Sequence, residues 1–427
     1  MISPASRSTL NRRALREWYL RNRNRTFALL NIPRSEAYFD RPIPLRLPVA
    51  FYDGHIPAFS FQKLVREALG APAIDAALEE LFERGIDPDR ADDATATRAA
   101  VQWPSRPQIT RFAQACDSAV LTALAGAELA DDANPLLAGA AAVYTILEHE
   151  EMHHETLLYM LHRLPLGRKH VAGRAGIYRE QQPVNTGRVV IPAGTATLGA
   201  RRDELRFGWD NEFEQQTVDV PAFEVNVNDV TNREYLEFVD DGGPVPPFWV
   251  PNGGEFRLLG MFEEMPLPMT WPVYVTKAQA DAFCTWRGAG ARLMSEAEYH
   301  RAAFGTPEGD ERPYPWGEEP PTSAHGNFDF WRFDPEPVGI SPQGASAWGV
   351  LDLIGNGWEW TSTEFRPLPG FEPMPTYPRY STDFFDERHF VVKGASPVTS
   401  RNLVRRSFRN WYRPEYPYVY ATFRCAY

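Results

Sequence analysis

The sequence changes character near residue 185, so no single repeating architecture describes the whole chain. Before this point apolar residues recur at helical spacing, with Ala, Leu, Glu and Arg between them. After it the apolar runs are short, Gly and Pro are frequent, and most of the twelve Trp residues occur. The 427 residues also exceed the roughly 250–300 that one hydrophobic core serves. We therefore expect two domains, residues 1–183 and 184–427, with the polar stretch 180–188 as their linker.

The first half predicts a bundle of four or five helices. Pro-containing breaks separate its periodic stretches, as they do between the helices of a bundle. A bundle of this kind can hold a metal ion between its helices. The stretches with helical periodicity are 61–69, 74–82, 109–124 and 136–164.

The second half predicts short strands and short helices, which makes the whole chain an α+β protein. Residues 188–198 and 216–227 have the apolar pattern of strands. Short helices are expected at 232–239, 277–286 and 295–304, and the last opens with a capping-box pattern. Much of the rest is expected to be irregular loop held together by aromatic packing.

The composition excludes several classes of protein. The charge sum is 44 − 56 = −12, so we expect no nucleic-acid partner. No stretch has the apolar length of a membrane span, and we expect no membrane contact. Cys116, Cys284 and Cys425 are widely spaced and form no CxxC motif, which suits a reducing compartment and argues against a fold held by disulfides. We expect a cytoplasmic protein.

Two histidines one helical turn apart form the first candidate metal site. His149 and His153 lie in LEHEEMHHETLLYML, and residues at i and i+4 project from one face of a helix. Neutral imidazole binds Zn, Fe, Cu and Ni, so the pair alone does not select the metal. Two histidines on a polar helix surface remain the structural alternative.

The same five residues match the H-E-x-x-H motif of zinc metallopeptidases. Under this alternative Glu150 is the general base. The longer metzincin form of the motif needs a Gly and a third His soon afterwards, and residues 154–157 do not supply them. A thermolysin-like site needs a Glu from a following helix as its third ligand, and residues 163–179 contain no Glu. The peptidase interpretation stays open as the less favoured one.

His55, in the aromatic stretch FYDGHIPAF, is the third candidate ligand. A lone His in such a setting is usually a core residue, and it becomes a ligand candidate because His149 and His153 need a partner from elsewhere in the bundle. Three imidazoles on one face of an ion leave the other positions open for substrate and O2, as in relatives of the facial triad of non-heme iron oxygenases.

The pairing of FYDGHIPAF with HEEMHHETLLYM resembles the DinB-like domain of the ergothioneine-biosynthesis sulfoxide synthases and the selenoneine synthases. The second half resembles the formylglycine-generating-enzyme-like domain of the same enzymes, which has a C-type-lectin-like fold. The resemblance spans about residues 40–427. The stretches that carry it in the second half are IPAGTATLGA (191–200), FGWDNEF (207–213), VTNREYLEFV (230–239), RLMSEAEYHRAAFG (292–305), YPWGEE (314–319), GNGWEWTST (355–363) and FRNWYRP (408–414).

This resemblance implies an Fe(2+) enzyme that uses O2 to bond sulfur or selenium to the imidazole C2 of hercynine, the trimethylated betaine of histidine. It implies His55, His149 and His153 as the iron ligands. Asn410 and Trp411 correspond to residues that bind hercynine, and an aromatic face suits a quaternary ammonium. Tyr380 is the candidate proton donor.

Position 412 departs from the family pattern. Relatives that use γ-glutamylcysteine carry Asp after the Asn-Trp pair, whereas this chain has Tyr412. We therefore expect cysteine or a selenosugar as the donor, with a slight preference for the selenosugar. Formylglycine generation is not expected, because residues 393–409 contain no cysteine. A non-enzymatic lectin-like binding module is the remaining alternative, and it leaves the three histidines unexplained.

Overall fold

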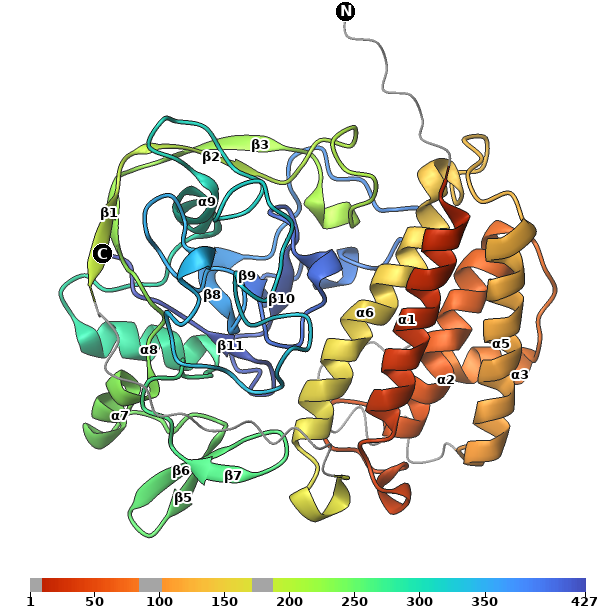
Figure 1. Ribbon diagram of the computed structural model, residues 1–427, viewed down its shortest axis with the longest axis horizontal. Coiled ribbons are helices and arrows are strands. Elements are labelled where there is room, and N and C mark those ends of the chain that lie inside the picture. The colour runs from red at the N-terminus through yellow and green to blue at the C-terminus, as the bar shows by residue number, and fades with distance from the viewer. Residues whose placement is uncertain (1–9, 84–101, 171–186) are drawn as a thin grey trace, which may run out of the picture. The chain divides into compact units, whose positions relative to one another are not determined.

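The computed structural model describes residues 10–83, 102–170 and 187–427. The chain divides into two compact units, Met1–His170 and Val171–Tyr427. Figure 1 shows helices in the first unit and short strands together with helices in the second. The predicted boundary at 183/184 and the predicted linker up to residue 186 lie outside the described residues. Arg188, which we predicted to end that linker, already belongs to a strand.

The first unit is a helical bundle, as its periodicity predicts. Helix α2 packs against α5 and α6, and α1 packs against α5 and α6. Short 3-10 helices lie at Ser35–Ala37, Ala138–Ala140 and Leu166–Arg168. The main helices are α1 (Arg12–Leu30), α2 (Val49–Ser60), the π-helix η2 that continues it (Phe61–Ala68), α3 (Ala76–Phe82), α5 (Arg106–Gly126) and α6 (Ala141–His162).

Helix α2, which carries His55, was not predicted from the sequence. It contains Gly54 and Pro57, both poor helix formers, and every residue except Asp53 is buried. A helix that is apolar all round has no polar face and therefore no amphipathic period. Its helical state depends on burial within the unit, which a local pattern does not reveal.

The second unit is built around a four-stranded sheet of order β10-β9-β8-β11. Strands β8 and β9 are antiparallel, as are β9 and β10, while β11 runs parallel to β8. Our expectation of mostly irregular loop did not include these strands, because β8, β9 and β11 are largely buried without period-two alternation and β10 has only three residues. They are β8 (Gly357–Glu364), β9 (Phe390–Ala395), β10 (Asn410–Tyr412) and β11 (Ala421–Thr422).

The remaining strands form three smaller antiparallel sheets. Each of the two predicted strands, 188–198 and 216–227, is in fact two strands, and β1 pairs with β4 while β2 pairs with β3. A third sheet has the order β5-β6-β7. The strands are β1 (Arg188–Ile191), β2 (Gly194–Leu198), β3 (Gln216–Val220), β4 (Phe223–Asn226), β5 (Trp249–Asn252), β6 (Glu255–Leu259) and β7 (Glu264–Pro266).

Three capped α-helices lie in the described part of the second unit, residues 187–427. They are α7 (Asn232–Asp240), α8 (Lys277–Arg287) and α9 (Glu296–Phe304). Each begins with a reciprocal capping box, and the one predicted for Ser295 and Glu298 is confirmed. Short 3-10 helices lie at Asp210–Glu212, Pro342–Gly344, Thr382–Phe384 and Arg401–Leu403.

A buried ion-pair network fixes the C-terminal segment of the second unit. The guanidinium of Arg424 donates to Asp229 Oδ1 at 2.9 Å and to Glu359 Oε2 at 2.8 Å. Two carboxylates and two backbone carbonyls, those of Val227 and Leu351, compensate the cost of burying this charge. Among the described residues no helix is long and apolar enough to cross a membrane.

Candidate functional site

Three histidines from two helices converge inside the first unit. The Nε2 atom of His153 lies 3.2 Å from that of His55 on α2 and 3.1 Å from that of His149 on α6. One ring nitrogen from each histidine lies within 4.8 Å of the other two, and no other group of three candidate ligands occurs in the part of the chain that the structure describes. The structure therefore brings together all three of the predicted metal ligands.

The orientation of the His55 ring is set from outside the cluster. Its Nδ1 lies 2.7 Å from the carbonyl oxygen of Phe82, the last residue of α3. A carbonyl only accepts, so Nδ1 carries the proton and donates it, which leaves the lone pair of Nε2 for a metal. Gly54 permits this approach, because a Cβ there would lie 2.5 Å from the Phe82 ring.

Aromatic rings from α2 restrain the histidines. Phe59 stacks on His149, with ring centroids 3.5 Å apart and an interplanar angle of 11°, and Phe51 stacks on His55 at 4.9 Å. The Tyr52 ring lies 5.7 Å from that of His153. These contacts limit rotation of each imidazole; His55 and His149 are buried, while His153 is partly exposed.

The cluster has the protonation state that a divalent metal requires. Burial lowers the pKa of His55 to about 4 and lowers the pKa values of His149 and His153 well below the usual 6.5. All three rings are therefore neutral at neutral pH, the form in which imidazole binds metals. Nitrogen ligands about 2.1 Å from an ion and at right angles to each other are about 3.0 Å apart, close to the two separations above. The residues therefore fit a three-histidine metal site.

Glu150, the candidate general base of the peptidase alternative, faces away from the cluster. Its Oε1 accepts hydrogen bonds from Arg23 at 2.8 Å and Thr26 at 2.6 Å, both on α1. The Thr26 hydroxyl also lies 2.9 Å from Nε2 of His154, so this histidine belongs to the same buried contact. A general base must reach the water that it activates. Glu150 instead joins α6 to α1.

In the second unit the structure brings Tyr380 and Trp411 together. Trp411 lies on β10, opposite Val391 of β9. Its ring stacks on Phe365 with centroids 4.0 Å apart and an angle of 9°, and the Tyr380 ring meets it edge-on at 5.4 Å. Tyr380 in turn stacks on Trp209 at 4.0 Å. Trp209 and Phe365 were not predicted as site residues, although Trp209 lies in the motif 207–213.

A buried polar contact holds the segment that carries Tyr380. Ser381 donates to Asp210 Oδ1 at 2.5 Å and accepts from Asn211 Nδ2 at 2.9 Å. Burial raises the pKa of Asp210 to about 6, while the hydrogen bond from Ser381 opposes that rise. Residues 210 and 211 follow Trp209, so one short stretch contacts both Tyr380 and its neighbour Ser381.

Asn410 and Tyr412 contact each other across Trp411. Asn410 Nδ2 donates to the Tyr412 hydroxyl at 3.2 Å, and its Oδ1 accepts from the backbone N–H of Trp411 at 2.9 Å. The Tyr412 ring stacks on Tyr416 with centroids 5.7 Å apart. All three residues of the predicted Asn-Trp-Tyr set are partly exposed. Of these three residues, Trp411 is the one that contacts Tyr380.

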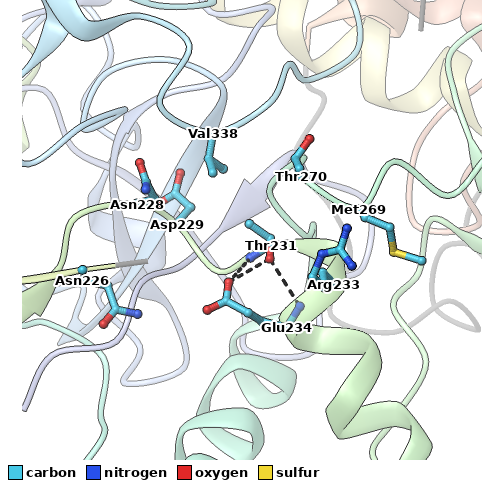
Figure 2. A pocket seen from close by; sticks show the side chains of 10 residues that line it. Asn226, Asn228, Asp229, Thr231, Arg233, Glu234, Met269, Thr270 and Val338 are labelled. Atoms are coloured by element: carbon cyan, nitrogen blue, oxygen red, sulfur yellow. Dashed lines mark hydrogen bonds between the residues drawn. The ribbon is translucent and has the colours of Figure 1, made fainter. Parts of the chain in front are cut away.

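Figure 2 shows a separate pocket of the second unit, at the start of α7. Its volume is about 70 Å³, and its lining contains none of the predicted site residues. Thr231 and Glu234 form the capping box of α7, and Asp229 pairs with Arg424. The polar groups here therefore serve the fold.

Comparison with known proteins identifies the family. The family model described as "Sulfatase-modifying factor enzyme 1-like domain" matches residues 175–427. A hercynine oxygenase of Mycolicibacterium thermoresistibile is 33% identical, over 95% of this chain and 92% of that protein. The chain belongs to the hercynine oxygenase family. A second hercynine oxygenase, from Mycobacterium tuberculosis, is 31% identical over 95% of this chain and 96% of its own length.

Membership of the hercynine oxygenase family confirms three predictions. The family resemblance is confirmed, and so is the α+β fold with a formylglycine-generating-enzyme-like second half. The chain is also confirmed as an enzyme of the oxidoreductase class. A fungal relative, ergothioneine biosynthesis protein 1 of Neurospora crassa, is 27% identical over 90% of this chain, which spans about half of that longer protein.

Proposed function

We propose that this chain is an iron(II)- and O2-dependent enzyme that forms a C–S or C–Se bond at the imidazole C2 of hercynine. Two lines support the proposal. The relatives named above are hercynine oxygenases and match nearly the whole chain. The single observation that carries it is the convergence of His55, His149 and His153 in a neutral cluster whose first two members are buried and whose third is partly exposed.

The three histidines would hold the iron on one side and leave its other positions for substrates. When bound, iron(II) would supply the one-electron chemistry by which O2 reacts with organic substrates. The chain's own contribution is to fix the ligands. The Phe82 carbonyl selects the His55 tautomer, and Phe59 restrains the His149 ring.

Asn410 and Trp411 would bind hercynine. The Trp411 ring attracts a trimethylammonium through its quadrupole, since this cation offers no N–H to a hydrogen-bond acceptor. Phe365, stacked on Trp411, keeps the indole in place. The Tyr380 hydroxyl would donate a proton during the reaction, and the stack on Trp209 limits where that hydroxyl can move.

The donor would be a selenosugar or cysteine rather than γ-glutamylcysteine. The glutamyl ammonium of γ-glutamylcysteine would need a carboxylate partner at position 412, which supplies a phenol ring instead. The parallel rings of Tyr412 and Tyr416 are of the kind that stacks on a sugar. On this basis we favour the selenosugar, which would make the product a selenoneine-type compound.

One assay tests the proposed function. The purified chain is loaded with iron(II) without oxygen, then given hercynine, O2 and each of the three donors, and the products are identified by mass spectrometry. We expect a hercynine adduct with a selenosugar or cysteine, none without O2, and little with histidine in place of hercynine. A zinc-loaded sample is the matched control. Failure to modify hercynine with any donor, or cleavage of casein by the zinc form, would contradict the proposal.

A further inference from the structure

Two cysteines far apart in the sequence meet in the second unit. The Sγ atoms of Cys284 on α8 and Cys425 in the C-terminal segment are 3.8 Å apart. Both thiols are free and buried, with 4% and 1% of their surface exposed. The third cysteine, Cys116, is buried on α5 of the first unit. Nothing in the proposed reaction uses any of these thiols.

The backbone holds both cysteines in place. The carbonyl of Cys425 accepts from the N–H of Asn226 at 3.0 Å, and the next residue, Ala426, exchanges two hydrogen bonds with Arg292. Cys284 lies in the last turn of α8, where its carbonyl accepts from Gly288. A disulfide has an S–S distance of about 2.05 Å, so the two sulfurs must approach by under about 2 Å. Side-chain rotation achieves this on backbones that are already neighbours.

We propose that Cys284 and Cys425 form an oxidation site, which a hydroperoxide converts to a disulfide. One thiolate attacks a peroxide oxygen, the O–O bond breaks, and a sulfenic acid and one water form. The second thiol then attacks that sulfur, the S–O bond breaks, and the second water leaves as the S–S bond forms. The two sulfurs lose two electrons in all, and the peroxide gains them.

Either thiol can act as the attacking sulfur, because either one can donate the hydrogen bond between them. Because both are buried, the reaction requires a brief local opening of the C-terminal segment. We expect it to be slow but specific.

The disulfide would fasten the segment that carries Arg424. That residue precedes Cys425 and bridges Asp229 and Glu359, so a covalent link to α8 would hold the ion-pair network in place. A disulfide that closes so long a loop restricts the unfolded chain, and we expect the melting temperature of the second unit to rise by about 5 °C or more.

The experiment treats the full-length chain with hydrogen peroxide in the presence of a chelator. Remaining thiols are then alkylated in denaturant, and tryptic peptides are identified by mass spectrometry. We expect a cross-linked peptide joining Cys284 to Cys425, an alkylated Cys116, and full reversal by dithiothreitol. Alkylation of all three cysteines, or a Cys425 sulfonic acid without the cross-link, would overturn the proposal.

Matched variants separate the pair from the third thiol. Cys116→Ser should still give the cross-linked peptide, while Cys284→Ser and Cys425→Ser should give none. The peptide analysis of the oxidised wild-type chain needs no variant, so it still tests the proposal if a variant fails to fold. The site is independent of the proposed function, and hercynine turnover need not be measured.

Discussion

The Nδ1 atom of His55 donates a hydrogen bond to the carbonyl oxygen of Phe82 at 2.7 Å. This contact turns Nε2 toward His149 and His153 and fixes its tautomer. It exists because residue 54 is glycine, whose missing Cβ lets the Phe82 ring approach α2. The FYDGHIPAF stretch therefore contributes a close helix contact as well as a histidine.

Gly54→Ala should weaken iron binding. The new methyl group would lie 2.5 Å from the Phe82 ring, so α3 and its carbonyl must move away from His55. Loss of the hydrogen bond that orients a metal-binding histidine typically lowers metal affinity about 10- to 100-fold. Anaerobic iron(II) titration measures the change. Gly126→Ala is the control, since a Cβ there meets nothing within 4 Å. Equal iron affinity in both variants would show that the Phe82 contact is unimportant.

Glu150→Ala should destabilise the first unit. The change removes the buried carboxylate that pairs with the partly buried guanidinium of Arg23, whose ion pair with Asp117 at 2.9 Å remains. Breaking a buried pair costs on the order of 3 kcal/mol in the free energy of unfolding. Urea unfolding of the full chain measures it. Glu17→Ala, at an exposed pair with Arg13, should cost under about 1 kcal/mol. A stable Glu150→Ala chain that has lost a peptidase activity would favour the metallopeptidase interpretation.

Trp411→Ala should reduce hercynine affinity by roughly thirtyfold. A desolvated cation–π contact contributes about 2 kcal/mol to the binding free energy. Histidine lacks the methyl groups, so the substitution should lower its affinity less than that of hercynine. Calorimetric titration of the iron-loaded chain without oxygen compares the two ligands. The exposed Trp331 supplies the control Trp331→Ala. If hercynine bound equally well to the wild type and to Trp411→Ala, Trp411 would have no role in binding it.

The stability of the second unit should depend on the titration of Asp210. Its pKa is about 6 in the folded chain and 3.8 in the unfolded one, so the folded state retains a proton between these values. The contribution of this retained proton to the free energy of unfolding is fully present below about pH 4 and is lost as the pH rises through 6. The difference of about 2 pKa units corresponds to about 3 kcal/mol.

Asp210→Asn isolates this effect, because the amide keeps an oxygen to accept from Ser381 but does not titrate. Urea unfolding of both chains from pH 4 to pH 7 gives the comparison. The wild type should lose stability relative to Asp210→Asn as the pH rises. Parallel curves would show that the Asp210 carboxyl titrates normally.

The sequence predicted the parts of the site that depend on local pattern. The i, i+4 spacing of His149 and His153 follows from a strongly periodic helix, and α6 has that form. The capping box at Ser295 has a short-range signature and was also found. Trp411 and Tyr380 were named as site residues only through the family resemblance, and their contact joins positions 31 apart in the sequence.

Other features depend on long-range packing and left no local signal. Helix α2 contains Gly and Pro and forms only because the bundle buries it. Strands β8, β9 and β11 are largely buried and lack alternation, and β10 has only three residues. The pairing of Cys284 with Cys425 joins α8 to the chain end. Spacing in the sequence gave no indication of it.

The central claim is that His55, His149 and His153 bind one iron. Equilibrium binding of iron(II) without oxygen, measured on the full chain and on the three single alanine variants, tests it most directly. His170→Ala, an exposed histidine of the same unit, is the control. We predict one iron per chain in the wild type and the control, none in His149→Ala or His153→Ala, and severely weakened binding in His55→Ala. Unchanged iron stoichiometry and affinity in any of the three would contradict the claim.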